Sequence, residues 1–212
     1  DTIEKALRSV TSEDQPPAEL LVMDGGSTDG TVDIIRRYAT KIAYWRSYVD
    51  GSAVIAMNEG IRRATGDIIC LLPADDWIEP GALHLVRDEF AADPTLEVLS
   101  CGARYTRVEA DGSIQVVAEF LDPQVLDFNM ENIVRRCLTG GRFILRRCYT
   151  EVGEFNPAYG MANDLDLLIR VLLRRPRSKV IPRLVYSYRQ HPGSRTLGGD
   201  PTMVGEMRSD AI

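Results

Sequence analysis

Two adjacent carboxylates, Asp75 and Asp76, follow a strongly apolar run at residues 67–72. Such a run is typical of a central strand of a parallel sheet, buried on both faces. Ligands of open α/β sheets bind just beyond the carboxyl ends of the strands, and a carboxylate-bound Mg²⁺ or Mn²⁺ usually shares its site with substrate phosphates. The pair therefore indicates a divalent-cation site or, equally well, a polar loop that caps the next helix.

Three further residues could take part in chemistry at the same edge. Asp24 ends a short apolar strand, so its carboxylate could accept hydrogen bonds from a base or a ribose, or could simply cap its own turn. Asp164 opens a helix that is apolar on most sides, where it could project into a cleft or complement the helix dipole. His191, on a loop beside an arginine, could bind a metal or a diphosphate, although alone it is typical of a surface histidine.

Several common sites are absent from the sequence. The glycine-rich turn at 25–31 has neither the Gly-Lys-Ser/Thr ending of a P-loop nor the Gly-x-Gly-x-x-Gly of a dinucleotide fold. A bound phosphate would then need a metal or basic side chains, which favours a cation on Asp76. No nucleophile elbow or paired Cys–His signature appears. The four cysteines show no zinc-ligand spacing, and Cys70, inside the apolar run, is expected to be a small buried hydrophobe.

The composition is that of a soluble globular protein. Of the 212 residues, 44% are hydrophobic and 26% are charged, and the net charge is -6. This length suffices for one large domain or for one domain with an appended subdomain. The acidic balance argues against broad nucleic-acid binding, and neither a membrane-spanning stretch nor a signal peptide is present. We therefore expect a reduced, cytosolic setting.

Strands and helices are expected to alternate through the first half of the chain. Helices predicted at 2–10, 32–38, 54–64 and 80–90 alternate with strands at 19–24, 42–45 and 67–72, a series that requires a parallel sheet. The second half has strands at 96–108, 113–120, 142–146 and 178–188, with helices at 131–138 and from about residue 162. Asp111-Gly112 joins the first two of these strands as a hairpin. We expect an α/β fold with a mostly parallel sheet flanked by helices and a mixed second half.

Taken in order, these motifs resemble the family 2 inverting glycosyltransferases, which have the GT-A fold. The most specific motif is Val22-Met23-Asp24-Gly25-Gly26-Ser27-Thr28-Asp29-Gly30-Thr31, and the others lie at 56–61, 66–69, 74–76, 152–155, 163–167 and 188–191. The resemblance covers nearly the whole chain and is strongest to the branch that assembles polysaccharides and lipid-linked glycans. It implies a Rossmann-like sheet, with a nucleotide-sugar-binding half at 1–95 and an acceptor-side half with the catalytic base at 96–212.

The resemblance also implies a role for each candidate residue. A sugar would pass from a nucleoside-diphosphate sugar to a glycan or lipid-linked hydroxyl, with inversion and with Mn²⁺ or Mg²⁺ on the diphosphate. Asp164 would be the general base, and Asp76 with His191 would hold the metal. The substrate-binding residues would be Asp24 on the base, Asp75 on the ribose or sugar and Asp50 in the nucleotide pocket. Asn58 would be a further substrate-binding residue. These roles require Asp24, Asp76 and Asp164 to converge on one cleft.

The chain also departs from the family pattern. Family members begin with a strand that ends near Pro-x-Tyr-Asn, and no such strand is found here, so we expect the first strand of the sheet to be absent. Either the chain is truncated or a partner chain fills the gap, because a missing central strand leaves its neighbours with open edges. In addition, Pro73 occupies a position where a further acid is common.

Two other functions stay open at this point. A sugar-phosphate nucleotidyltransferase would use a similar sheet, but its basic, glycine-rich activating loop is absent from the start of the sequence. A truncated or inactive nucleotide-sugar-binding module would bind the donor without transferring it. We expect a cytoplasmic enzyme with no nucleic-acid partner, located at the inner face of the membrane if its acceptor is lipid-linked. A homo-oligomer is compatible with these features.

Overall fold

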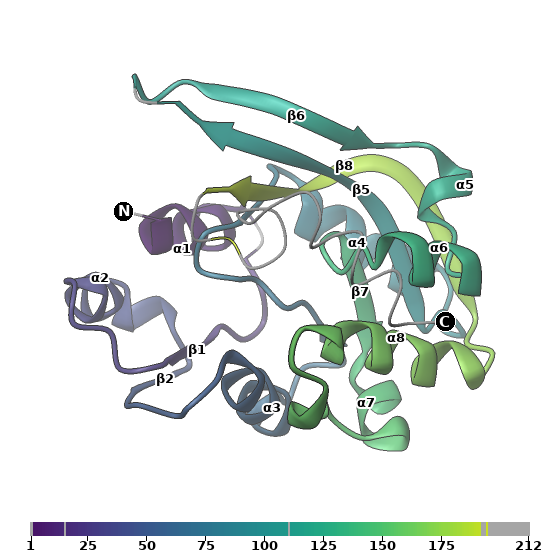
Figure 1. Cartoon of the computed structure of the whole chain (residues 1–212), viewed down its shortest axis with the longest axis horizontal. Coiled ribbons are helices and arrows are strands. Elements are labelled where there is room, and N and C mark those ends of the chain that lie inside the picture. The colour runs from purple at the N-terminus through teal and green to yellow at the C-terminus, as the bar shows by residue number, and fades with distance from the viewer. Residues whose placement is uncertain (1, 15, 110, 192–193, 195–212) are drawn as a thin grey trace.

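The computed structural model describes residues 2–14, 16–109, 111–191 and 194. In the first half, helices α1 (Thr2–Thr11), α2 (Thr31–Arg37), α3 (Ala53–Arg63) and α4 (Ala82–Ala92) alternate with strands β1 (Leu21–Asp24), β2 (Tyr44–Ser47), β3 (Ile68–Ile69) and β4 (Trp77–Ile78). The second half contains β5 (Val98–Val108), β6 (Ile114–Phe120), α5 (Pro123–Leu126), α6 (Met130–Arg136), β7 (Arg142–Leu145), α7 (Arg146–Val152), α8 (Asn163–Leu173) and β8 (Ser178–Gln190). Two short 3₁₀ helices, η1 (Ala39–Lys41) and η2 (Pro157–Ala162), complete the fold (Figure 1).

The strands form a mixed arrangement, so the expectation of a mostly parallel sheet was wrong. β1 and β2 pair in parallel, and the larger sheet has the order β3-β7-β5-β8-β4 with β6 added to β5. In the larger sheet only β5 and β8 run parallel, whereas the other four pairings are antiparallel. The physical reason is the connections: parallel neighbours need long crossovers, whereas β6 follows β5 through a hairpin and β7 enters from the opposite end.

The two sheets are not joined by strand pairing in the described part of the chain. β1 pairs only with β2, and β3 pairs only with β7. This interruption limits the strands with which β3 can pair, and the absence of a first strand stays a prediction. The interruption also explains why only Ile68 and Ile69 of the apolar run form a strand, and why Cys70 is exposed rather than buried as expected. The thiol still has protein on several sides, and burial raises the pKa of Cys70 to about 12.

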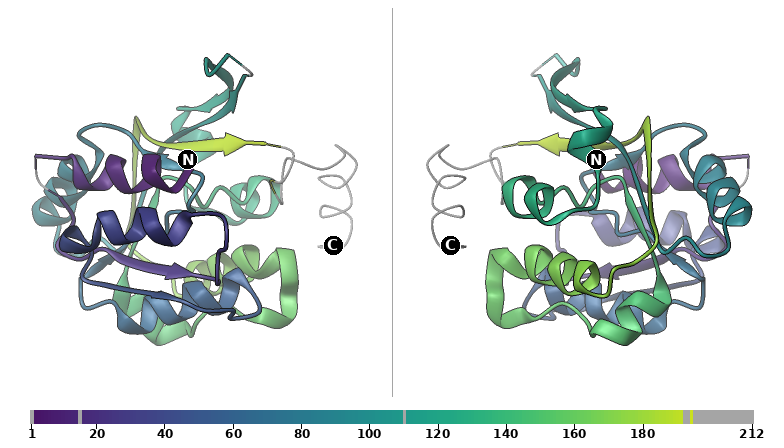
Figure 2. Two further views of the ribbon diagram at one scale, coloured as in Figure 1. Left: turned by 90° about the vertical axis from the view of Figure 1, so that its left-hand side faces the viewer. Right: turned by 90° about the vertical axis from the view of Figure 1, so that its right-hand side faces the viewer.

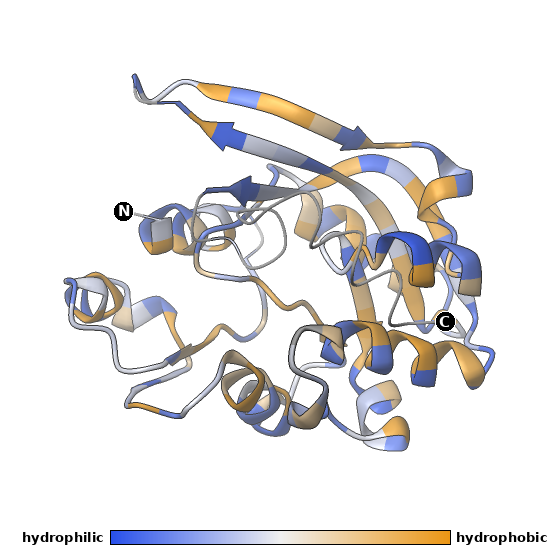
Figure 3. Ribbon diagram, in the orientation of Figure 1, coloured by the Kyte–Doolittle hydropathy of each residue, from blue (hydrophilic) through white to orange (hydrophobic). Residues whose placement is uncertain are grey.

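Three groups of buried hydrophobic residues hold the elements together. One lies beneath α8 and includes Leu167, Leu168 and Val171, as expected for a helix with a wide apolar surface (Figure 3). A second packs α4 against β5 and β8, and a third lies between α1 and α2. The side views show α1 and α2 on one side of the molecule and α6 and α8 on the other (Figure 2). None of the helices that the structure describes is long and apolar enough to span a bilayer.

The packing of Gly140 against Tyr186 yields a stability prediction. A Cβ atom on Gly140 would lie 2.5 Å from Cε1 of the Tyr186 ring. We expect Gly140→Ala to lower the free energy of unfolding by about 1–3 kcal/mol, because a packed ring cannot yield that space without strain. Urea unfolding measures the change.

The matched control is Gly60→Ala in α3. A Cβ atom there would meet only Cγ of Met23, at 3.8 Å. Because alanine favours the helix interior over glycine by up to about 1 kcal/mol, this variant should be as stable as the wild type or more stable. Equal losses in the two variants would contradict the packing explanation.

Candidate functional site

The turn after β3 carries Asp76, whose side chain is only 1% exposed. The hydroxyl of Tyr186 donates a hydrogen bond to Oδ2 of Asp76 at 2.5 Å, and the backbone N–H of Arg189 donates to Oδ1 at 2.9 Å. Burial raises the pKa of Asp76 to about 7, and these two hydrogen bonds only partly counter it. Both carboxylate oxygens are therefore used within the fold, where they tie the acidic turn to β8.

Asp75 is the accessible carboxylate of this turn, and His191 lies beside it. Nε2 of His191 is 2.8 Å from Oδ2 of Asp75, and the two side chains are 35% and 33% exposed. Of the two residues expected to hold a metal, the structure thus exposes His191 and encloses Asp76.

The fit of Asp75 and His191 to a cation follows from their donor atoms. Carboxylate oxygen and imidazole nitrogen are ligands that Mn²⁺ accepts. Within the described ranges, no three His, Cys, Asp or Glu side chains gather closely enough to enclose a metal. Two protein ligands do fit Mn²⁺ or Mg²⁺ that takes its remaining ligands from water and from substrate phosphates, which is the usual arrangement for Mg²⁺.

Asp164 lies in the first turn of α8 and is half-buried. Burial raises the pKa of its carboxylate, and the structure gives this carboxylate no hydrogen bond or ion pair with any described residue. Asp166, two residues later, points elsewhere and accepts a bond from Nη2 of Arg170 at 2.7 Å, as expected because residues two apart do not share a helix face. Among the described residues Asp164 is therefore a carboxylate without a bonding partner and with a raised pKa, which is suited to taking up a proton.

Two buried tyrosines, Tyr149 and Tyr186, lie near acids of the candidate site. Burial is the main reason why the pKa of Tyr149 is raised, and the charges of Cys70 and Asp164 add to it. Burial likewise raises the pKa of Tyr186, with additions from Asp76, Cys70 and Asp75. The charge of Asp164 thus acts on Tyr149 and the charges of the acidic turn act on Tyr186, and the convergence of these acids on one cleft stays a prediction.

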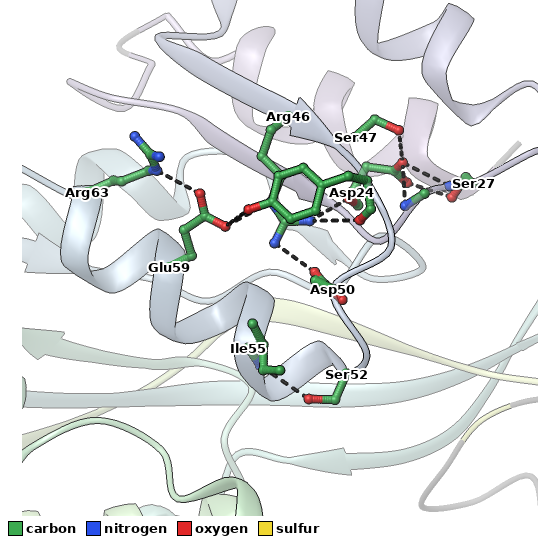
Figure 4. Close-up of polar contacts among 11 residues, drawn as sticks. Asp24, Ser27, Arg46, Ser47, Asp50, Ser52, Ile55, Glu59 and Arg63 are labelled. Atoms are coloured by element: carbon green, nitrogen blue, oxygen red, sulfur yellow. Dashed lines mark hydrogen bonds and ion pairs between the residues drawn. The ribbon is translucent and has the colours of Figure 1, made fainter.

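Asp24 caps its own turn, which is one of the two roles that the sequence left open. The backbone N–H groups of Gly26 and Ser27 donate to Oδ2 of Asp24 at 3.1 and 2.9 Å. The hydroxyl of Ser27 donates to Oδ1 at 2.5 Å, and that of Ser47 donates to Oδ2 at 2.6 Å (Figure 4). Burial opposes ionisation, but the hydrogen bonds outweigh it and lower the pKa of Asp24. The carboxylate already accepts four hydrogen bonds, and its contact with a base stays a prediction.

A buried arginine that the sequence reasoning missed, Arg46, holds Asp50. Nη2 of Arg46 lies 2.7 Å from Oδ2 of Asp50, and Nε lies 2.9 Å from Oε2 of Glu59. Nη1 donates to the backbone oxygen of Asp24 at 2.5 Å (Figure 4). The signal was present in the sequence, because Arg46 extends a predicted apolar strand and a charge there needs a partner.

Glu59 of α3 is the second member of this network. Hydrogen bonds from Arg63 and from the hydroxyl of Tyr48, with Arg46 adding to them, lower the pKa of Glu59 to about 2. Glu59 is therefore ionised at neutral pH, and it fixes α3 against β2.

Asn58 does not present its amide to a substrate in this structure. Nδ2 of Asn58 donates to the backbone oxygen of Phe155 at 2.8 Å, and the N–H of Phe155 donates to Oδ1 of Asn58 at 2.9 Å. The side chain is buried. Both polar groups of the amide are therefore used within the fold, where they join α3 to the segment that precedes α8.

Comparison with known proteins shows where the chain has relatives. Residues 1–152 match the model of the family described as Glycosyl transferase family 2. The poly-beta-1,6-N-acetyl-D-glucosamine synthase of Staphylococcus epidermidis is 31% identical over 109 residues, which are 49% of this chain and 26% of the synthase. The chain spans only 20–30% of the length of the curated relatives that it matches.

Solved structures share the fold. S. aureus TarS in complex with UDP-GlcNAc superposes with a TM-score of 0.71 at 17% identity, covering 97% of this chain and 60% of that one. The mannosyltransferase PcManGT of Pyrobaculum calidifontis, in complex with GDP-Man and Mn2+, has a TM-score of 0.63 at 21% identity, covering 92% and 55%. These similarities establish an α/β fold with a mixed sheet and flanking helices of the GT-A type.

The raised pKa of Asp164 predicts how stability depends on pH. A carboxyl group whose pKa is higher in the folded than in the unfolded chain contributes stability below the ordinary value of 3.8, and this contribution is lost as the pH rises through the raised value. We therefore expect Asp164→Asn to be more stable than the wild type at neutral pH. The gain is about 1.4 kcal/mol for each pH unit by which the pKa of Asp164 in the folded chain exceeds that in the unfolded chain. Urea unfolding at neutral and at mildly acidic pH measures this difference, which should shrink on acidification.

The control for this prediction is Asp166→Asn, which removes the ion pair with Arg170 and should lower stability at neutral pH. If Asp164→Asn also proved less stable than the wild type at neutral pH, the carboxylate would have a stabilising partner, contrary to the structure.

Proposed function

The chain belongs to glycosyl transferase family 2, and from that premise we propose that it transfers a sugar from a nucleoside-diphosphate sugar to a hydroxyl group of a glycan or lipid-linked acceptor, with inversion. The observation that carries the proposal is the presence of two complementary features in the described chain. One is the accessible pair Asp75–His191, and the other is the uncommitted carboxylate of Asp164, whose pKa burial raises. The first suits a donor diphosphate with its cation, and the second suits an acceptor hydroxyl.

The similar proteins support a nucleotide-sugar donor. The structure of TarS is a complex with UDP-GlcNAc and that of PcManGT is a complex with GDP-Man and Mn2+. The related synthase is named for a polymer of N-acetyl-D-glucosamine. We carry over the donor class and the polysaccharide context to this chain as proposals. A lipid-linked acceptor would place the reaction at the inner, cytoplasmic face of a membrane.

In the proposed reaction Asp164 removes the proton from the acceptor hydroxyl as the acceptor oxygen attacks the anomeric carbon of the donor. The attack comes from the face opposite the leaving nucleoside diphosphate, so the C–O bond to the diphosphate breaks while the new glycosidic bond forms. This geometry inverts the configuration at the anomeric carbon. The raised pKa favours this role, because a stronger base takes the proton more readily.

The acidic turn would stabilise the leaving nucleoside diphosphate. Asp75 and His191 would hold Mn²⁺ or Mg²⁺, which supplies Lewis-acid stabilisation of the charge on the departing diphosphate. Asp76 keeps the turn in place through Tyr186 and Arg189. Asp24 and Asp50, held by the serines and by Arg46, would shape the nucleotide pocket.

The interrupted sheet favours one alternative from a different class. With no strand pairing between β1 and β3 in the described chain, the domain could bind a nucleotide sugar without aligning it for transfer. A thermal-shift screen of UDP-GlcNAc, GDP-mannose and their free nucleotides with Mn²⁺ detects binding, because a ligand that binds the native state raises its stability. Binding without release of nucleoside diphosphate in the presence of any acceptor would favour the binding module.

The first functional prediction concerns Asp164→Asn. We expect donor binding to be unchanged and the rate of transfer to fall by about 10²-fold or more, because the variant cannot accept the proton. Calorimetric titration of the donor and a nucleoside-diphosphate release assay measure the two effects. Asp33→Asn, at a side chain that is 73% exposed on α2, serves as the control. Turnover like that of the wild type in Asp164→Asn would remove Asp164 from the role of base.

The second functional prediction separates the two acids of the turn. In the wild type Mn²⁺ should strengthen nucleotide binding, and Asp75→Ala should lose this gain while binding the nucleotide as the wild type does without metal. Asp76→Ala should mainly lose stability, because its carboxylate is bonded within the fold. Titrations with and without Mn²⁺ distinguish the residues. If Mn²⁺ no longer strengthened nucleotide binding in a folded Asp76→Ala but still did so in Asp75→Ala, the metal ligand would be Asp76 and not Asp75.

A further inference from the structure

Helix α3 carries two adjacent buried polar residues that reach in different directions. Glu59 accepts hydrogen bonds from Arg46 at 2.9 Å and from the hydroxyl of Tyr48 at 2.8 Å, which attaches α3 to the strand and loop of the nucleotide half. Asn58 instead forms its two hydrogen bonds with the backbone of Phe155, just before η2 and α8. Figure 1 shows α3 between β1–β2 and the start of α8.

The segment that Asn58 holds is fixed from its other side by the helix that carries Asp164. Nη1 of Arg170, on α8, donates to the backbone oxygens of Val152 and Gly153 at 2.5 and 3.2 Å. Nη2 of Arg170 donates to the backbone oxygen of Glu154 at 2.8 Å and to Asp166 at 2.7 Å. Residues 152–155 are therefore held between Asn58 of α3 and Arg170 of α8.

We propose that Asn58 is a positioning residue that sets where Asp164 lies relative to the bound donor, an inference that rests on the proposed function. The donor side is defined by Arg46, which bonds the backbone of Asp24, the carboxylate of Asp50 and Glu59 on α3. From the neighbouring Asn58 the contacts run through Phe155 and the 152–154 backbone to Arg170. A series of polar contacts, buried at Arg46 and Asn58 and partly exposed at Arg170, thus links the nucleotide half to the helix of the base.

The chemistry of the amide explains why an asparagine is needed there. Its side chain donates one hydrogen bond and accepts another, which matches a backbone C=O and N–H of the same residue. An aspartate would face the Phe155 oxygen with a second acceptor, and an alanine would leave both backbone groups without partners in a buried place. No single substitution to another residue of this size preserves both bonds.

The expected consequence is a loss of transfer rather than of donor binding. In an Asn58 variant the contacts of Glu59 with Arg46 and Tyr48 remain, so the nucleotide pocket keeps its shape. The segment before α8 loses its anchor, and small displacements of a catalytic group are costly, since about 1 Å can reduce a rate 10²-fold.

The test compares Asn58→Ala with Arg62→Ala in release of UDP from UDP-GlcNAc, with Mn²⁺ and β-linked N-acetylglucosamine oligosaccharides. Arg62 lies on the same helix and contacts the same segment through Glu154 at 2.5 Å, but both side chains are solvent-accessible, at 55% and 33%. We expect kcat of Asn58→Ala to fall about tenfold or more while the donor KM stays within about twofold. Arg62→Ala should stay within about twofold in both, because exposed ion pairs contribute little.

Three results would overturn the inference. The first is an unchanged kcat in folded Asn58→Ala. The second is a rise in donor KM without a fall in kcat, which would make Asn58 a substrate contact. The third applies if Asn58→Ala does not fold, and it is an unchanged kcat in Arg170→Lys. That variant keeps the charge near Asp166 but loses the set of hydrogen bonds from the guanidinium to the backbone oxygens of residues 152–154.

Amide hydrogen exchange separates failure of this inference from failure of the proposed function. If the wild-type protein transfers no sugar at all, the proposed function fails, and exchange still tests the contact. Exchange over residues 152–166 should then be faster in Asn58→Ala than in the wild type, with residues 21–24 unaffected and Arg62→Ala like the wild type. Equal exchange over 152–166 in all three proteins would overturn the positioning role.

Discussion

A carboxylate removed from water must find hydrogen-bond donors or a positive charge, and this requirement sorts the acids of the protein into two groups. Asp24, Asp50 and Asp76 are buried and bound by serines, an arginine, a tyrosine and backbone amides. They hold turns in place. Asp75 and Asp164 remain accessible to a ligand, the first beside His191 and the second with a pKa raised by burial. The proposed function assigns the chemistry to these two accessible acids.

The same requirement explains how much of the site could be read from the sequence. The types and order of the motifs were sufficient to predict the family and an α/β fold with flanking helices. They also predicted that Asp164 and Asp166 point in different directions. They were not sufficient to decide between a ligand contact and a cap at Asp24, because that choice depends on Ser47, which lies on a neighbouring strand. Asp76 posed the same problem, since its partners Tyr186 and Arg189 come from the end of the chain.

The sheet was predicted less well, for a related reason. Hydrophobic runs identify strands but do not specify their neighbours, so the alternating first half suggested parallel pairing throughout. The pairing depends on contacts between distant residues, such as Ile69 with Ile144 in the antiparallel β3–β7 pair. The exposure of Cys70 has the same origin, because a strand is buried only where neighbours cover it.

The interrupted sheet gives particular weight to the side chains of α3. In most α/β domains, hydrogen bonds between adjacent strands fix the two halves of a nucleotide site relative to each other. Here β1 and β3 are not paired within the described chain, so side-chain contacts must supply part of that constraint. Glu59 and Asn58 are suited to it because both are buried and bonded to groups far along the sequence. Directional hydrogen bonds with no water to replace them define a relative position more sharply than apolar packing, which tolerates sliding. The distance between the donor and the base therefore depends on two polar residues of one helix.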